Sequence, residues 1–304
     1  MSVPAHQPVG AFAPVTSDRL ELGEGPRLLS DGSVILVDIL TGRLLRLPQD
    51  ETGPLVELAR LAQPLGAVAP LGAAGRSPGG WAVATGMDFA VLDEAGKTVR
   101  TVAVAPQAGS PQRMNDAVCD PAGRMWAGTM AYDATPGAGA LHRWNTDGSV
   151  TRVLDGLTVP NGPVFSPDGH TLYLADSAAG TVEAFRVDPG TAELSDRRPV
   201  FRVAPEDGSP DGMAVDSDGS VWSAIWGGGQ IRRYSPRGQL LQTVDVPALQ
   251  PTAVCLTGQH LIVTTAAYGL ADPGPWDGAV LRATCTATAA ATPSASASLA
   301  ERSV

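Results

Sequence analysis

Four polar residues occupy the same position relative to a turn glycine, and this register limits the possible folds more than any other feature of the chain. Each lies eight residues before its glycine: Glu24 before Gly32, Asn115 before Gly123, Asn161 before Gly169, and Asp211 before Gly219. Gly80 and Gly258 lie in comparable turns. The six turns therefore recur at intervals of roughly 40–50 residues, which is the period of a repeat protein.

Each turn glycine is followed by a short apolar or alternating run, and a second run comes about ten residues later. The first repeat shows this in Val34-Ile-Leu-Val-Asp and Arg43-Leu-Leu-Arg-Leu. Such runs, bounded by Gly, Pro, Asp and Ser, indicate strands. Six copies predict an all-β fold, a six-bladed β-propeller with four-stranded antiparallel blades around a central channel. A β-sandwich or β-helix is the alternative, but a sandwich would not explain six copies with one internal order.

The sequence predicts one domain with two unstructured ends. Residues 11–283 form the propeller, with 43% of the chain hydrophobic and able to supply its core. Residues 1–10 are expected to be flexible, and residues 284–304, rich in Ala, Thr and Ser, to form a disordered tail. The segment from Val15 to Leu22 is expected to provide the outer strand that joins the first blade to the last.

Charge and composition exclude several classes of function. The net charge is −10 and Lys and Arg do not cluster, so no nucleic acid partner is expected. No run of 18 apolar residues and no signal peptide is present, so no membrane association is expected. No obligate protein partner is evident. The three cysteines lack metal-type spacing, which favours buried thiols in a cytoplasmic protein.

A closed ring would bring the four residues of the register together on its axis. The carboxylates of Glu24 and Asp211 and the amides of Asn115 and Asn161 would then form the oxygen-rich cage that a hard divalent cation requires. Any one of them could instead cap a loop or form an Asx turn. The shared register favours ligation. The other two repeats lack the polar residue, which would leave part of the cation's shell open, as in catalytic sites.

Three residues near the same mouth are candidates for substrate contact. Asn115 can act as a ligand or as a hydrogen-bond donor, because its amide offers both functions. Arg113 would bind an anion or hydroxyl, and Asp133 would emerge near the pocket after its strand. The alternatives are a surface arginine and a solvated loop carboxylate. The histidines lie outside the register, and no nucleophile motif occurs.

Several segments closely resemble the SMP-30/regucalcin/gluconolactonase family. The resemblance runs from about residue 15 to 283. Its motifs are Leu22-Gly-Glu-Gly-Pro, Arg113-Met-Asn-Asp-Ala-Val-Cys-Asp-Pro-Ala-Gly with its trailing Ala-Gly-Thr-Met, Pro160-Asn-Gly-Pro-Val-Phe and Pro210-Asp-Gly-Met-Ala-Val-Asp. Ala117 departs from the glycine usual after Asn-Asp, and Gly227 stands where relatives often carry a polar residue.

The resemblance implies a six-bladed propeller with one divalent cation in its channel. By motif it assigns Glu24, Asn161 and Asp211 to the metal and Asn115 to a nearby polar contact. It assigns Arg113 and Asp133 to substrate contact. Members of the family hydrolyse sugar lactones such as gluconolactone with calcium, zinc, manganese or magnesium, and some relatives act on other lactones or phosphotriesters.

The expected protein is a metal-dependent lactonase of the gluconolactonase type, with calcium as the first candidate and zinc, manganese or magnesium as alternatives. Asp211 is the expected general base toward an activated water molecule. One alternative is a hydrolase of another ester, an aromatic lactone or a phosphotriester. Another is a calcium-binding propeller without enzymatic activity.

Overall fold

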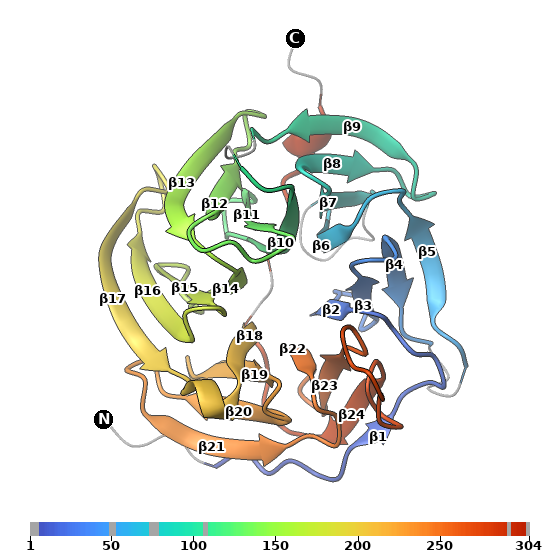
Figure 1. The fold of residues 1–304 in the computed structure, drawn as a ribbon. Coiled ribbons are helices and arrows are strands. Elements are labelled where there is room, and N and C mark those ends of the chain that lie inside the picture. Colours follow the sequence, from blue (N-terminus) through green and yellow to red (C-terminus); the bar gives the residue numbers. More distant parts are fainter. Residues whose placement is uncertain (1–5, 49–52, 73–78, 106–108, 291–292, 302–304) are drawn as a thin grey trace.

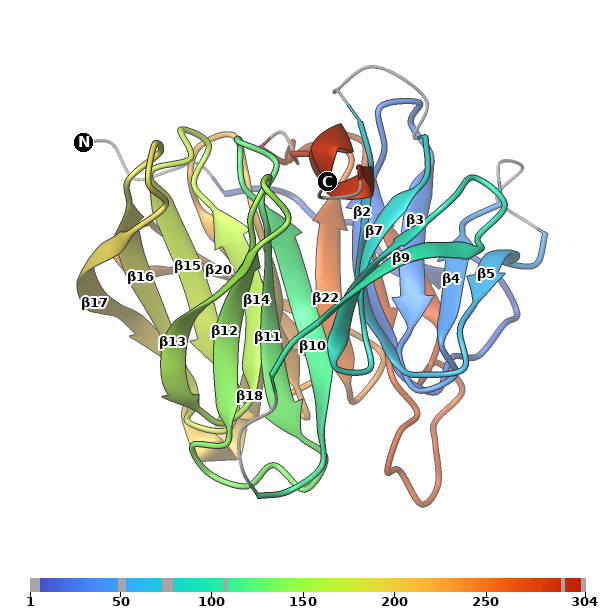
Figure 2. The ribbon, with the colours of Figure 1, turned by 90° about the horizontal axis from the view of Figure 1, so that it is seen from above.

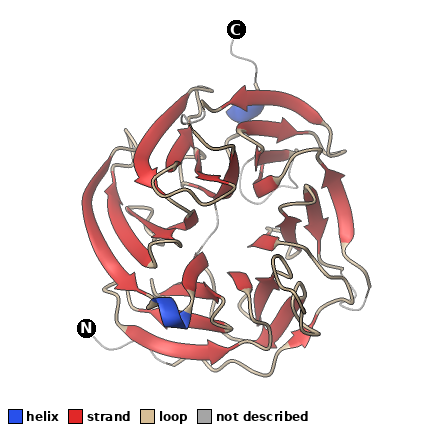
Figure 3. Cartoon of the chain, viewed as in Figure 1, coloured by secondary structure: helices blue, strands red, loops and turns tan. Residues whose placement is uncertain are grey.

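The computed structural model describes residues 6–48, 53–72, 79–105, 109–290 and 293–301. Six antiparallel sheets of four strands each surround a common axis (Figure 1). Nearly all regular structure is strand, as Figure 3 shows. The predicted six-bladed β-propeller is confirmed.

Within the first five blades the strands follow the sequence from the axis outward. The first blade contains β2 (Gly23–Leu28), β3 (Val34–Asp38), β4 (Arg43–Arg46) and β5 (Val56–Arg60). The second contains β6 (Leu65–Pro70), β7 (Trp81–Thr85), β8 (Asp88–Leu92) and β9 (Thr98–Ala103). The third contains β10 (Gln112–Cys119), β11 (Met125–Ala131), β12 (Gly139–Trp144) and β13 (Val150–Leu157).

The remaining blades keep this order up to the last one. The fourth contains β14 (Pro160–Phe165), β15 (Thr171–Asp176), β16 (Thr181–Val187) and β17 (Leu194–Arg202). The fifth contains β18 (Ser209–Val215), β19 (Val221–Trp226), β20 (Gln230–Tyr234) and β21 (Leu240–Asp245). The sixth contains β22 (Pro251–Leu256), β23 (His260–Thr265), β24 (Val280–Thr284) and the N-terminal β1 (Ala13–Pro14). Two short 3-10 helices, η1 (Pro205–Asp207) and η2 (Ala297–Ala300), complete the described structure, which has no helix long and apolar enough to cross a membrane.

The ring closes through the N-terminal strand, a few residues earlier than predicted. Ala13 and Pro14 of β1 pair with Arg282 and Leu281 of β24, so the outer strand of the sixth blade comes from the start of the chain. The predicted segment, Val15 to Leu22, continues from this strand toward the first blade. Val15 still donates its backbone N–H to the Val280 carbonyl, at 2.8 Å. The proline in this strand is tolerated because an edge strand needs to donate on one side only.

Each of the six innermost strands contains a β-bulge at the same place. In β2 the register shifts between Glu24 and Arg27, and in β14 between Asn161 and Val164. The other four innermost strands show the corresponding irregularity. A bulge re-aims a side chain relative to the pleat. The bulges of β10 and β18 contain Asn115 and Asp211, and those of β2 and β14 begin directly after Glu24 and Asn161.

Described residues near both ends of the chain are packed, which differs from the sequence-based expectation. Residues 1–5 lie outside the described residues. Beyond them, Gly10 donates its backbone N–H to the Thr284 carbonyl at 2.9 Å. In the expected tail, Ala295 and Leu299 are fully buried in an apolar cluster. The η2 end lies at the upper edge of Figure 2, whereas the loop 266–279, in orange, lies at the lower edge. Small alanine side chains fill gaps between blades without a periodic pattern, so the sequence carried no signal of this packing.

Candidate metal centre and substrate cavity

The four residues of the polar register meet at the axis. Glu24 on β2, Asn115 on β10, Asn161 on β14 and Asp211 on β18 are each only 4–6% exposed. All four line one cavity of about 260 Å³. Tyr268, which is 48% exposed, lines the same cavity and so marks its mouth. The convergence predicted from the repeat is therefore present in the structure.

Glycines follow three of these side chains, and at two of them the backbone turns into the left-handed region. Gly25 and Gly162 both have φ of 53°, a conformation that favours glycine. Gly25 donates its N–H to Glu24 Oε2 at 2.9 Å, and Gly162 donates to Asn161 Oδ1 at 3.1 Å. In the Glu-Gly and Asn-Gly pairs, the glycine N–H thus forms a hydrogen bond that orients the side chain before it, at the place where the strand is bulged.

Asp211 and Asn161 contact each other directly. Asn161 donates from Nδ2 to Asp211 Oδ1, and Ser177 Oγ lies 3.4 Å from the same nitrogen. As a cation ligand, Asn161 would have to turn its amide so that Oδ1 replaces Nδ2, because only the oxygen can donate electrons to a metal. The side chain is otherwise already in place between blades four and five.

Arg113 and Asn115 lie together on the third blade. Arg113 Nη1 donates to Asn115 Oδ1 at 2.8 Å, and Asn115 Nδ2 donates to the Pro160 carbonyl at 3.0 Å. Both ends of the Asn115 amide are therefore engaged by protein. Arg113 is only 7% exposed, so the surface-arginine alternative does not describe it. Its guanidinium is the positive charge of the cavity lining.

The structure does not bring Asp133 into this cavity. Its carboxylate is exposed and accepts hydrogen bonds from Thr135 Oγ1 at 2.7 Å and Ser110 Oγ at 3.0 Å. These bonds, the Thr135 hydroxyl first, lower the pKa of Asp133. Its position matches the loop-carboxylate alternative, and a substrate contact through Asp133 stays a prediction.

Asp116 is a buried carboxylate that sequence reasoning did not select. It is 8% exposed, follows Asn115 directly, and accepts the Ala117 N–H at 2.7 Å. It lines a second, smaller cavity of about 110 Å³ together with Arg27. The only signal in the sequence was its place in the Asn-Asp pair of the third repeat.

The cavity concentrates negative charge in a dry environment. Burial raises the pKa of Glu24, and the neighbouring carboxylates of Asp211 and Asp116 raise it further. Burial likewise raises the pKa of Asp211, with Asp116 as the next cause. Arg113 opposes both shifts only in part. Two buried carboxylates that repel each other are stable in the charged form only when a cation compensates them.

The donor set fits a hard divalent cation. Glu24, Asp211 and Asn161 offer carboxylate and amide oxygens from three blades, the ligand chemistry of calcium, magnesium or manganese. Within the described residues, no three His, Cys, Asp or Glu side chains are grouped to hold a metal. Any site here therefore depends on Asn161 as well as on the two carboxylates.

We expect the stability of chelator-treated protein to fall as the pH rises above about 4. Glu24 and Asp211 keep their protons to a higher pH in the folded protein than in the unfolded chain, where such acids titrate near pH 4. The folded state then binds more protons over this range, and the slope of the free energy of unfolding against pH is negative. Urea unfolding in the presence of chelator, between pH 4.5 and 7.5, measures the free energy of unfolding and its slope against pH. Asp211→Asn, which resembles the protonated form, should have a flatter slope; identical slopes would contradict the assignment.

Apolar side chains form much of the remaining cavity lining. They are Leu22, Ile39, Met130, Val159, Ala178, Trp226 and the ring of Tyr268. These residues come from strand ends and loops of different blades, which no local pattern connects.

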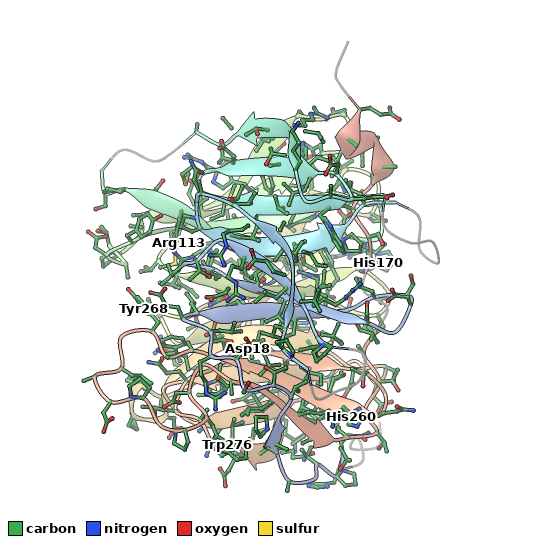
Figure 4. The ribbon with its side chains drawn as sticks, turned by 90° about the vertical axis from the view of Figure 1, so that its right-hand side faces the viewer. Asp18, Arg113, His170, His260, Tyr268 and Trp276 are labelled. Carbon is green, nitrogen blue, oxygen red and sulfur yellow. The ribbon has the colours of Figure 1, made fainter. Side chains whose placement is uncertain are left out.

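None of the histidines, all of which are described, lines the cavity. Figure 4 shows Arg113 and Tyr268 toward one side of the propeller and His170 and His260 toward the other. His142 is buried in the third blade, and burial lowers its pKa to about 4. A histidine-based metal centre is therefore absent from this cavity.

These features define a class of protein, a six-bladed propeller with a cage of buried carboxylates and amides on its axis. A family model described as SMP-30/Gluconolactonase/LRE-like region matches residues 22–267. Regucalcin of Danio rerio is 35% identical over 263 residues, covering 84% of this chain and 86% of its own. Regucalcin of Gallus gallus is 33% identical over 266 residues, covering 84% and 87%.

A solved structure extends the likeness to the fold. The calcium-binding protein regucalcin from Agrobacterium tumefaciens superimposes with a TM-score of 0.83 at 25% identity, covering 94% of this chain and 97% of its own. The chain belongs to the SMP-30/gluconolactonase/LRE-like family.

Proposed function

We propose that this protein is a divalent-metal-dependent hydrolase that opens the ring of a lactone, with sugar lactones of the gluconolactone type as the first class to test. The observation that carries the proposal is the burial of Glu24 and Asp211 side by side with Asn161 in one cavity. The family model adds support, since it names gluconolactonase. Calcium is the first candidate cation, because all ligands are oxygens and a similar solved protein is described as calcium-binding.

A divalent cation held by Glu24, Asn161 and Asp211 would supply a Lewis acid that polarises the lactone carbonyl and lowers the pKa of a water molecule. Asp211 accepts a proton from the attacking water through its second carboxylate oxygen. The water oxygen bonds to the carbonyl carbon, the bond from that carbon to the ring oxygen breaks, and the ring oxygen takes up a proton. The product is one hydroxy acid.

Arg113 orients the substrate in this scheme. Its guanidinium lies beside Asn115 in the cavity lining and carries several N–H donors. Directed at the carbonyl oxygen, it stabilises the negative charge that develops there. The substrate is a small molecule, so the reaction requires no nucleic acid, membrane or protein partner. The described cysteines are free and buried, in keeping with the proposed cytoplasmic location.

The test is proton release from gluconolactone and from unsubstituted δ-valerolactone. The protein is stripped of metal and then supplied with Ca²⁺, Mn²⁺, Mg²⁺ or Zn²⁺ one at a time. Turnover above the spontaneous rate that requires one of these ions supports the proposal. Metal binding without turnover of either lactone would refute it and would favour a calcium-binding propeller.

Metal should stabilise the protein through Glu24. At a free cation concentration of one hundred times Kd, binding to the folded state adds about 2.7 kcal/mol to the free energy of unfolding. Glu24→Gln keeps the shape but removes one negative charge, so we expect most of this gain to disappear. Thermal unfolding in chelator and at increasing Ca²⁺ concentrations measures this stabilisation for the wild type and the variant. An equal rise in Tm for wild type and variant would place the cation elsewhere.

A further inference from the structure

One side of the cavity is a continuous apolar wall that spans two distant blades. Trp226, at the end of β19 in the fifth blade, packs against the apolar cluster that contains Leu22 and Ile39. Leu22 and Ile39 are 7% and 2% exposed. All three also line the cavity that holds Glu24 and Asp211. We call Leu22, Ile39 and Trp226 the apolar wall.

Much of the polar lining is already committed to hydrogen bonds within the protein. Both ends of the Asn115 amide are engaged, and Arg113 Nη1 donates to Asn115 Oδ1 and to the Met114 carbonyl. Ser177 Oγ donates to the Pro210 carbonyl at 2.7 Å. The three residues after Trp226 are Gly227, Gly228 and Gly229, and they bring no polar side chain. Leu22 and Ile39 therefore offer no partner to a hydroxyl group placed against them, and the indole N–H of Trp226 is the one polar group of the wall.

We propose that the lactone taken by this cavity carries an apolar substituent, which lies against the apolar wall while the ester group faces Glu24, Asp211 and Arg113. This inference rests on the proposed lactone hydrolysis and narrows its substrate class. Apolar surface buried against the wall is favourable, by about fourfold in affinity for each methylene group. A hydroxyl buried at the same place without a partner is unfavourable by about tenfold.

Three lactones with the same six-membered ring test the proposal. Unsubstituted δ-valerolactone is the reference, a δ-lactone with a five-carbon alkyl chain on the ring carbon bearing oxygen is the apolar probe, and glucono-1,5-lactone is the hydroxylated probe. We expect kcat/KM of the alkyl lactone to exceed that of δ-valerolactone by at least tenfold. We expect glucono-1,5-lactone to fall below the alkyl lactone. A higher kcat/KM for glucono-1,5-lactone than for the alkyl lactone would overturn the inference.

Variants of Trp226 test whether the apolar wall causes the preference for the alkyl lactone. Trp226→Gln should reduce the ratio of kcat/KM for the alkyl lactone to kcat/KM for δ-valerolactone by about tenfold, because the alkyl chain loses the apolar surface that it contacts. Trp226→Phe retains an aromatic surface and should keep most of the preference. Circular dichroism and Tm establish that each variant is folded. Equal losses for both lactones in folded Trp226→Gln would overturn the role of the wall.

Binding of the corresponding δ-lactams separates this inference from the proposed function. Lactams resist hydrolysis, so calorimetry reports their affinity whether or not the protein turns over lactones. Tighter binding of the alkyl lactam than of the unsubstituted lactam, lost in Trp226→Gln, supports the apolar subsite even if no lactone is hydrolysed. Equal affinities of the two lactams would overturn it even if lactones are hydrolysed.

Discussion

Asp211→Asn should lower kcat/KM for lactone hydrolysis by about 10²–10⁴-fold, the usual contribution of a general base. The amide of the variant cannot accept the proton of the attacking water. The substitution also removes one of the two carboxylates that face the cation site. Asp211 is 4% exposed and in direct contact with Asn161, so the neutral isostere can occupy the same space. Initial rates at saturating metal measure the loss.

The base assignment and the ligand assignment can be separated by measuring metal affinity alongside. Calorimetric titration with Ca²⁺ measures how much the substitution weakens cation binding. Rates at saturating Ca²⁺ then measure the loss of turnover that weaker binding does not explain. Asp147→Asn is the matched control, because Asp147 is an exposed turn carboxylate that only bonds Ser149 locally. Full turnover in Asp211→Asn at saturating metal would show that another group takes the proton.

Asp216→Ala should destabilise the fold by about 3–5 kcal/mol, the usual result of removing one partner from a buried ion pair. Asp216 Oδ2 accepts from Trp222 Nε1 and from Arg233 Nε, both at 2.9 Å. Arg233 is 1% exposed. The substitution removes a buried carboxylate from this guanidinium in the fifth blade, which also lies 3.6 Å from the exposed Asp218 carboxylate. Urea unfolding at pH 7 measures the change in free energy.

Asp218→Asn provides the control for this effect. Its carboxylate is 53% exposed, and exposed ion pairs contribute about 0–1 kcal/mol. The third blade contains a similar arrangement, in which Asp120 Oδ2 accepts from Trp126 Nε1 at 3.0 Å and from Arg124 Nε at 2.5 Å. A loss below 1 kcal/mol in Asp216→Ala would mean that the buried network does not stabilise the blade.

Asp133 and the chain ends show where the local sequence gives too little information. Asp133 follows β11 in a turn whose path is set by Ser110 and Thr135, and these side chains hold it outside the cavity. The alanine-rich tail has no periodicity, yet Ala295 and Leu299 are buried against the second and third blades. In both cases the outcome depends on contacts between segments far apart in the chain, which local composition does not encode.

The sequence by itself determined the number of blades, the order of their strands and the register of Glu24, Asn161 and Asp211. Strand alternation and turn glycines are local, and repetition carries each residue to an equivalent place in its blade. Only the tertiary structure decided that Trp226 packs against the cluster containing Leu22 and Ile39, and that all three line one cavity. That contact joins blades five and one, and it depends on the closure of the ring through β1 and on the loops at its mouth.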